Sequence, residues 1–159
     1  MNKLIKLLFI ILSLQLVLTG VVFYSYGYFS TEPETIPLIG LKKDNIKKIT
    51  LEGPSSKKVE LENINGMWVL PKKNNFPANS AQINQLLDRL IETKLGSKIS
   101  QQASSHSRLR VSEVEFERKL TISNDEQRQT TIFFGSAPSL RQSHARIMNN
   151  DEVYIVKFS

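Results

Sequence analysis

An uninterrupted apolar stretch near the N-terminus constrains this chain more than any other feature. No charged side chain occurs from Leu7 to Phe29. A helix of this length extends roughly 35 Å, enough to cross a hydrocarbon core of about 30 Å. Its far end carries a cluster of aromatic residues, which favour the membrane interface; these are Tyr24, Tyr26, Tyr28 and Phe29. We therefore expect residues 7–29 to be a transmembrane anchor.

The charges that flank this stretch predict its orientation. Lys3 and Lys6 precede it, whereas Glu32 and Glu34 are the first charges after it. The positive-inside rule then places residues 1–6 in the cytoplasm and the rest of the chain in the periplasm, anchored in the inner (plasma) membrane. A cleaved signal peptide is the alternative. The apolar stretch is too long for one, and the nearest small-x-small site, Ser25-Tyr26-Gly27, contains a bulky aromatic residue.

Composition narrows what the exported part can be. The 159-residue chain has no cysteine, so neither a thiol-linked lipid nor a disulfide can hold it. About 130 residues remain after the anchor, enough for one domain with its own core. The net charge of +6 is mild, and we expect no nucleic-acid partner.

The first part of the exported chain predicts a stalk and three strands. Residues 30–45 contain two prolines and read as a stalk, so that 46–159 form the domain. Apolar residues then alternate with polar ones around Ile49 and again around Leu61, as in half-buried strands. Asn65-Gly66 is a strong hairpin signal before a third strand, Met67-Trp68-Val69-Leu70. Trp68 is expected to pack in the core or at its rim.

One amphipathic helix is expected next. Asn79 is a suitable N-cap, with Gln82 three residues on as in a capping box. The apolar residues that follow have helical spacing and predict one buried stripe: Ile83, Leu86, Leu87, Leu90 and Ile91. Gly96 is the expected stop.

The remainder predicts mainly β-structure. A short strand is expected near Ile99, and four more are expected in "VEFERKLTIS", "RQTTIFFG", "HARIM" and "EVYIVKF". Strands in runs with a single interposed helix indicate an α+β fold with a mainly antiparallel sheet. The sequence leaves open whether the last strand pairs within the chain or exposes an edge to another protein.

Several motifs together resemble a known family. "ITLEG…VELENINGMWVL", "FPANSAQINQLLDRL", "HSRLRVSEVEFERKLTI", "TIFFGSAPSLRQSHARI" and "DEVYIV" follow in this order over about Ile46 to Val156. In this the chain resembles the bacterial domain-of-unknown-function family 4340. The resemblance implies a single-pass, exported protein, in some cases encoded beside ABC transporters. It implies no activity and no catalytic residue.

The sequence favours neither a zinc site nor a serine triad. Zinc needs three or four converging ligands, but the chain has only two histidines, His106 and His144, which are expected to be exposed. A serine triad would draw on Ser136, Ser139, Ser143, His144 and Asp151. The "GSAPS" segment lacks the second glycine of a nucleophile elbow, so a turn is expected there. We predict no catalytic residue, no cofactor and no metal.

Arginines supply the one predicted contact site. Arg108, Arg141 and Arg146 would offer planar, bidentate donors to an anion or a partner if they converged near "GSAPSLRQSHAR". Separate surface ion pairs are the alternative.

Two functions are compatible with these residues. The first is a non-enzymatic, membrane-anchored interaction module, accessory to a membrane transport or envelope complex. The second is a binding domain for an anionic ligand, either a cell-wall fragment or a lipid headgroup, contacted by those three arginines. The oligomeric state is left open by the sequence.

Overall fold

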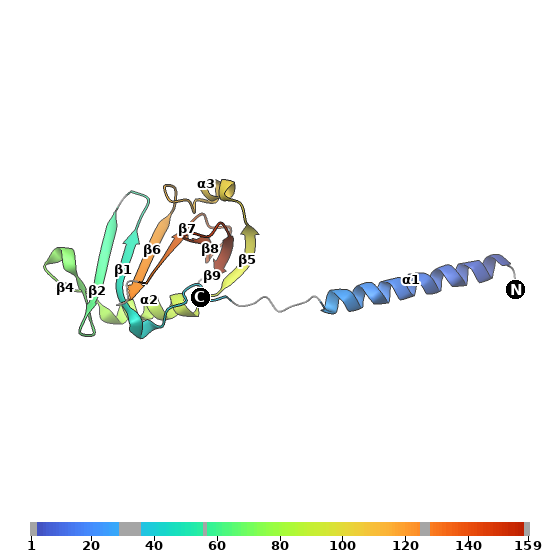
Figure 1. The fold of residues 1–159 in the computed structure, drawn as a ribbon, viewed down its shortest axis with the longest axis horizontal. Helices are drawn as coiled ribbons and strands as arrows, with labels where there is room; N and C mark the ends of the chain where they lie inside the picture. Colours follow the sequence, from blue (N-terminus) through green and yellow to red (C-terminus); the bar gives the residue numbers. More distant parts are fainter. Residues whose placement is uncertain (1–2, 29–35, 56, 125–127, 158–159) are drawn as a thin grey trace. The chain divides into compact units, whose positions relative to one another are not determined.

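The computed structural model describes an N-terminal helix, a nine-stranded antiparallel sheet and several shorter helices (Figure 1). The described part of the chain comprises residues 3–28, 36–55, 57–124 and 128–157. The chain divides into two compact units, Met1–Glu34 and Thr35–Ser159.

The first unit contains α1 (Lys3–Tyr28). Its segment Ile5–Val22 is long and apolar enough to cross a membrane. Ser13 lies within this segment, and its hydroxyl donates a hydrogen bond to the Phe9 carbonyl at 2.9 Å. Because that bond pairs the hydroxyl inside the helix, Ser13 is compatible with an apolar environment. The segment lies within the predicted range 7–29 except at its first two residues.

The second unit is α+β, as predicted. Its helical elements are η1 (Lys43–Asn45), η2 (Pro71–Lys73), α2 (Ser80–Glu92), η3 (Ala103–Ser105) and α3 (His106–Leu109). Its strands are β1 (Ile46–Glu52), β2 (Lys58–Ile64), β3 (Met67–Leu70), β4 (Phe76–Pro77), β5 (Leu95–Ser100), β6 (Arg118–Asn124), β7 (Gln129–Phe134), β8 (Gln142–Ile147) and β9 (Val153–Lys157). They are ordered β4-β3-β2-β1-β6-β7-β8-β9-β5, and every pair of neighbours is antiparallel.

Turn chemistry sets the hairpins where the sequence predicts them. Asn65 and Gly66 both have positive φ, at 51° and 87°, and they join β2 to β3. The Asn63 side chain accepts a hydrogen bond from the Gly66 amide at 2.9 Å. Pro71 then ends β3 by starting η2. These local signals fix the register of the hairpin. In this register Trp68 points into the core, with 2% of its surface exposed.

Helix α2 packs its apolar side against the sheet. Asn79 caps it, because the side-chain oxygen accepts a hydrogen bond from the Gln82 amide at 3.2 Å. Ile83, Leu87 and Leu90 are buried in the main core. Leu86 was expected to be buried with them, but it is 44% exposed and lies at the border of the stripe.

The helix ends earlier than Gly96, and that expectation is wrong. It stops at Glu92, where the Thr93 hydroxyl donates to the Arg89 carbonyl at 2.7 Å. Gly96 instead lies in β5, where a Cβ atom would approach the Ile155 carbonyl oxygen to 2.7 Å. A glycine here permits close contact between two strands rather than a helix C-cap.

The domain also begins earlier than residue 46. Leu38 and Ile39 belong to the predicted stalk, residues 30–45, but both are almost completely buried in the main core. Pro37 pairs with Lys94 in an antiparallel bridge, and the Leu38 amide donates to the Thr93 carbonyl at 2.9 Å. The unit Thr35–Ser159 therefore includes residues 35–45 of that range.

The last strand pairs within the chain. Strand β9 lies between β8 and β5 and bonds to both. The edge strands of the described sheet are β4 and β5. The open edge considered for the C-terminal strand therefore belongs to β5.

Candidate functional site

Arg146, one of the three arginines predicted to contact an anion, is a buried side chain of β8 with 5% of its surface exposed. Its Nε donates to the Val111 carbonyl at 2.7 Å, and one terminal nitrogen donates to the Asn150 carbonyl at 3.2 Å. The guanidinium also lies 4.7 Å from the centre of the Phe133 ring. Burial lowers the pKa of Arg146, while the Glu113 and Asp151 charges oppose that shift. This guanidinium binds two backbone carbonyls of the protein itself.

The other two arginines lie at the surface. Arg108 is on α3, and Arg141 precedes β8 with a positive φ of 58°. Neither has an ion pair in the part of the chain that is described. The structure therefore leaves Arg108 and Arg141 accessible to a ligand, whereas Arg146 points into the protein.

Both histidines are buried, contrary to the expectation of exposed positions. The reason is that each ring contacts a segment distant in the sequence or beyond a turn: His106 of α3 contacts the connection before β9, and His144 of β8 contacts the loop after β7. The His106 Nε2 lies 3.0 Å from the Asp151 carbonyl, and the His144 Nδ1 lies 3.0 Å from the Ser136 hydroxyl. Burial lowers the pKa of His144 and the Arg108 charge adds to this, while a hydrogen bond with Ser136 acts in the opposite direction.

The residues considered for a serine triad are divided between two histidines. Ser136 contacts His144, but its hydroxyl also donates to the Leu109 carbonyl at 3.3 Å. The Asp151 carboxylate lies 3.9 Å from His106 instead. Ser143 donates to the Gly135 and His144 carbonyls. These contacts attach a loop to the sheet. They do not link a nucleophile to a base and that base to an orienting carboxylate, as a triad requires.

Among the described residues, no three side chains of the types His, Asp and Glu lie close enough to hold an ion.

The sheet face opposite α2 has an apolar half and a polar half. The apolar half is closed by the end of α3 and the segment after it, which bury Leu109, Val111 and Phe116 against Phe133 and Val153. The polar half lies over β2, β1, β6 and β7 and forms a hollow of about 570 Å³. Strand register aligns Glu60, Thr50, Thr121 and Thr131 in one row across this half.

Most charges in the polar half are already paired. Glu60 accepts from Lys72 at 2.9 Å and from Lys58 at 3.0 Å, and these contacts lower the pKa of Glu60 to about 2. Lys119 lies 3.7 Å from Glu52. The Thr121 and Thr131 hydroxyls are 3.1 Å apart and share a hydrogen bond. The groups of this hollow therefore largely satisfy one another.

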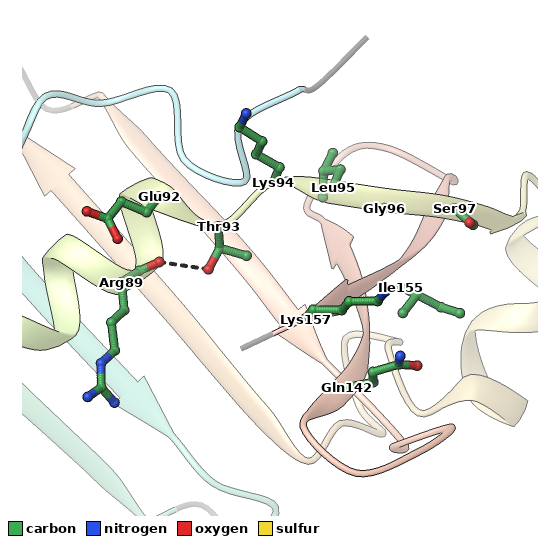
Figure 2. Close-up of a pocket in the computed structure, with 10 residues that line it drawn as sticks. All are labelled: Arg89, Glu92, Thr93, Lys94, Leu95, Gly96, Ser97, Gln142, Ile155 and Lys157. Carbon is green, nitrogen blue, oxygen red and sulfur yellow. Dashed lines mark hydrogen bonds between the residues drawn. The ribbon is translucent and has the colours of Figure 1, made fainter. Parts of the chain in front are cut away.

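A second hollow, of about 520 Å³, lies where α2 ends and β5 begins. Figure 2 shows Arg89, Glu92 and Thr93 at the helix end on one side and Gln142, Ile155 and Lys157 of β8 and β9 on the other. Lys94, Leu95, Gly96 and Ser97 run between them. We call this hollow the β5 groove.

The charges of the β5 groove are not paired. Arg89, Lys94 and Lys157 are exposed cations, and Glu92 is the one acidic residue of the lining. None of these four side chains has an ion pair in the described part of the chain. The groove therefore has an excess of positive charge beside an open sheet edge. Sequence reasoning missed it, because its lining comes from three separate segments. Arg89 and Lys94 are near one another in the sequence, but nothing along the chain indicates that Lys157 lies beside them.

The described part of the chain has a helix that is long and apolar enough to span a membrane, and an antiparallel α+β domain follows it. These two features place the protein in the general class of chains with a helix of membrane-spanning length ahead of one folded domain. The particular family is given by residues 68–159, which match the family described as Domain of unknown function (DUF4340). The match covers more than half of the chain, and the chain belongs to this family. No curated protein and no solved structure matches it.

Proposed function

We propose that this protein is a membrane-anchored interaction module whose domain, residues 35–159, binds a partner in a membrane transport or envelope complex. The observation that carries the proposal is an apolar helix of spanning length ahead of a domain with its own core. An anchor confines the domain to the membrane surface. This raises its effective concentration near membrane partners without any new contact.

The proposed orientation places the domain in the periplasm. It is supported by Lys3 and Lys6 before the helix and by Glu32 and Glu34 after it. Because the chain lacks cysteine, a single introduced thiol reports on one side of the membrane. A membrane-impermeant maleimide should label Ser139→Cys in intact cells but should label Asn2→Cys only after lysis. The reverse pattern would contradict this orientation.

Anchoring is tested by alkaline extraction of membranes from cells that express the full chain. The wild-type protein should stay in the membrane fraction. Leu12→Lys combined with Leu16→Lys should release it, because each lysine costs roughly 2.5–3.5 kcal/mol near the centre of a membrane helix. Leu140→Lys, at a residue 90% exposed in the domain, is the matched control and should change nothing. A wild-type chain in the soluble fraction would refute the anchor.

An anionic ligand is the second candidate function. It is favoured by the exposed, unpaired guanidinium groups of Arg108 and Arg141 in the described part of the chain. Binding to vesicles that contain an anionic lipid should weaken as salt rises and should fall in Arg108→Ala combined with Arg141→Ala. Binding that is independent of salt, or unchanged in this double variant, would count against it.

A further inference from the structure

The two edges of the described sheet differ in their ability to accept another strand. Strand β4 has only two residues, and one of them is Pro77, which has no amide hydrogen to donate. Strand β5 has six residues, none of them proline. Its stretch Gly96–Ile99 is exposed. Unpaired backbone groups on such an edge can pair with an added chain.

The edge of β5 already accepts an antiparallel segment of its own chain. The Leu95 amide donates to the Ile36 carbonyl at 2.9 Å, and the Leu38 amide donates to the Thr93 carbonyl at the same distance. Past Leu95, no described segment lies on this side of β5 as far as Ile99. Among the described residues, the edge that holds Ile36–Leu38 is therefore open from Gly96 to Ile99.

The charge of the β5 groove determines which kind of segment could bind beside the open stretch of β5. The lining of the β5 groove has one acidic residue and three cations, and none of these cations has an ion pair with a described residue. Lys98, on the open stretch itself, is neutralised by Glu152. A second copy of the chain would bring Lys94 and its neighbours against identical cations, which is unfavourable. An acidic segment would instead offset the excess charge.

We propose that the open edge Gly96–Ile99 and the β5 groove bind an extended acidic segment of a partner protein as an added strand. The backbone of that segment would pair with β5, and its carboxylates would face Lys94 and Lys157. This inference rests on the proposed function as an interaction module, for which it names the contact surface and the chemistry of the partner.

Fluorescence anisotropy with three synthetic peptides and the full chain in detergent tests this directly. The acidic peptide alternates glutamate and threonine. The basic peptide has lysine in place of glutamate, and the third peptide keeps the glutamates but replaces threonine with proline. We expect the acidic peptide to bind at least about tenfold more tightly than either other peptide, because it alone combines complementary charge with free backbone amides.

Variants of the protein supply the second half of the test. Lys94→Glu combined with Lys157→Glu should weaken binding of the acidic peptide by about tenfold or more. Lys48→Glu combined with Lys73→Glu makes the same change in net charge at exposed residues elsewhere, and it should leave the affinity within about twofold. Equal binding of the acidic and basic peptides, or full binding of the proline peptide, would overturn the proposal. Edge-dependent self-association in sedimentation would overturn it in favour of a second copy.

A photo-crosslinking amino acid in cells separates this inference from the function on which it rests. Placed at Ile99, it should capture the partner, whereas at Val114, an exposed residue of the loop after α3, it should not. A partner captured from Val114 alone would refute the β5 edge but keep the interaction module. Capture of no partner from either position or by lysine-reactive crosslinking would refute both.

Discussion

Replacing Gly135 with alanine should detach the segment after α3 from the sheet. A Cβ atom at this position would stand 2.1 Å from the Leu109 carbonyl oxygen and 2.7 Å from that of Arg110. Both atoms are main chain and cannot rotate away, so the segment itself has to move. That movement strains the hydrogen bond from the Ser136 amide to the Leu109 carbonyl, and it disturbs the buried Val111 side chain.

The expected loss of stability follows from these contacts. Overpacking of a filled site costs about 1–3 kcal/mol, and each backbone hydrogen bond lost costs about 1 kcal/mol. Together they predict a decrease of about 2–4 kcal/mol in the free energy of unfolding. With a urea m-value near 2 kcal/mol/M, the unfolding midpoint should fall by about 1–2 M.

The protein carries its own reporter for this measurement. Trp68 is the single tryptophan and is 2% exposed, so its fluorescence should change when the domain unfolds. Gly40→Ala is the matched control, since a Cβ atom there would meet nothing within 4 Å. If the midpoint of Gly135→Ala equals that of Gly40→Ala, the close approach of the segment to the sheet is refuted.

Three further predictions use the same urea assay. Leu87→Ala should lower the free energy of unfolding by about 2–5 kcal/mol because Leu87 is 1% exposed in the core. Leu86→Ala should lower it far less. Equal losses would refute the assignment of the buried stripe. His144 has a pKa below its ordinary value of 6.5. The unfolded chain therefore binds this proton more readily, and stability should fall as pH drops through 6.5 and level off below the folded pKa. His144→Gln should remove that component, and an unchanged pH profile would contradict it. Glu152 has its pKa lowered to about 2, first by its hydrogen bond with Lys98. The stabilising contribution of Glu152 should be present above pH 4.5 and be lost as the pH falls toward 2. Glu152→Gln should remove this part of the pH dependence of stability.

The parts of the fold that the sequence predicted depend on neighbours along the chain. Asn65-Gly66 specifies its hairpin because both residues tolerate positive φ, and Asn79 specifies the start of α2 through its own side chain. Alternation around Ile49 and Leu61 assigns one face of each strand to the core. Each of these signals acts between residues that are close in the sequence. It can therefore be recognised without knowing which distant segments come into contact.

The parts that sequence reasoning missed depend on contacts between distant segments. Leu38 and Ile39 read as stalk because they follow prolines, but pairing with the start of β5 brings them into the core. His144 reads as a surface histidine until its contact with Ser136 is known. Gly96 reads as a helix stop, whereas its role is set by Ile155 on another strand.

The same contrast between local signals and distant contacts applies to the candidate site. The presence of Arg141 and Arg146 in one segment cannot reveal that Arg146 points inward to the Val111 carbonyl. The β5 groove draws its cations from α2, from Lys94 just before β5 and from β9, so only the strand order brings them together.

Crosslinking of the full-length protein in cells, followed by mass spectrometry of the attached peptides, tests the central claim most directly. The account predicts reproducible crosslinks from residues 35–159 to a protein of a membrane complex, recovered in the membrane fraction. Crosslinks only within the chain itself, or none above those of an unanchored control, would contradict a membrane-anchored interaction module.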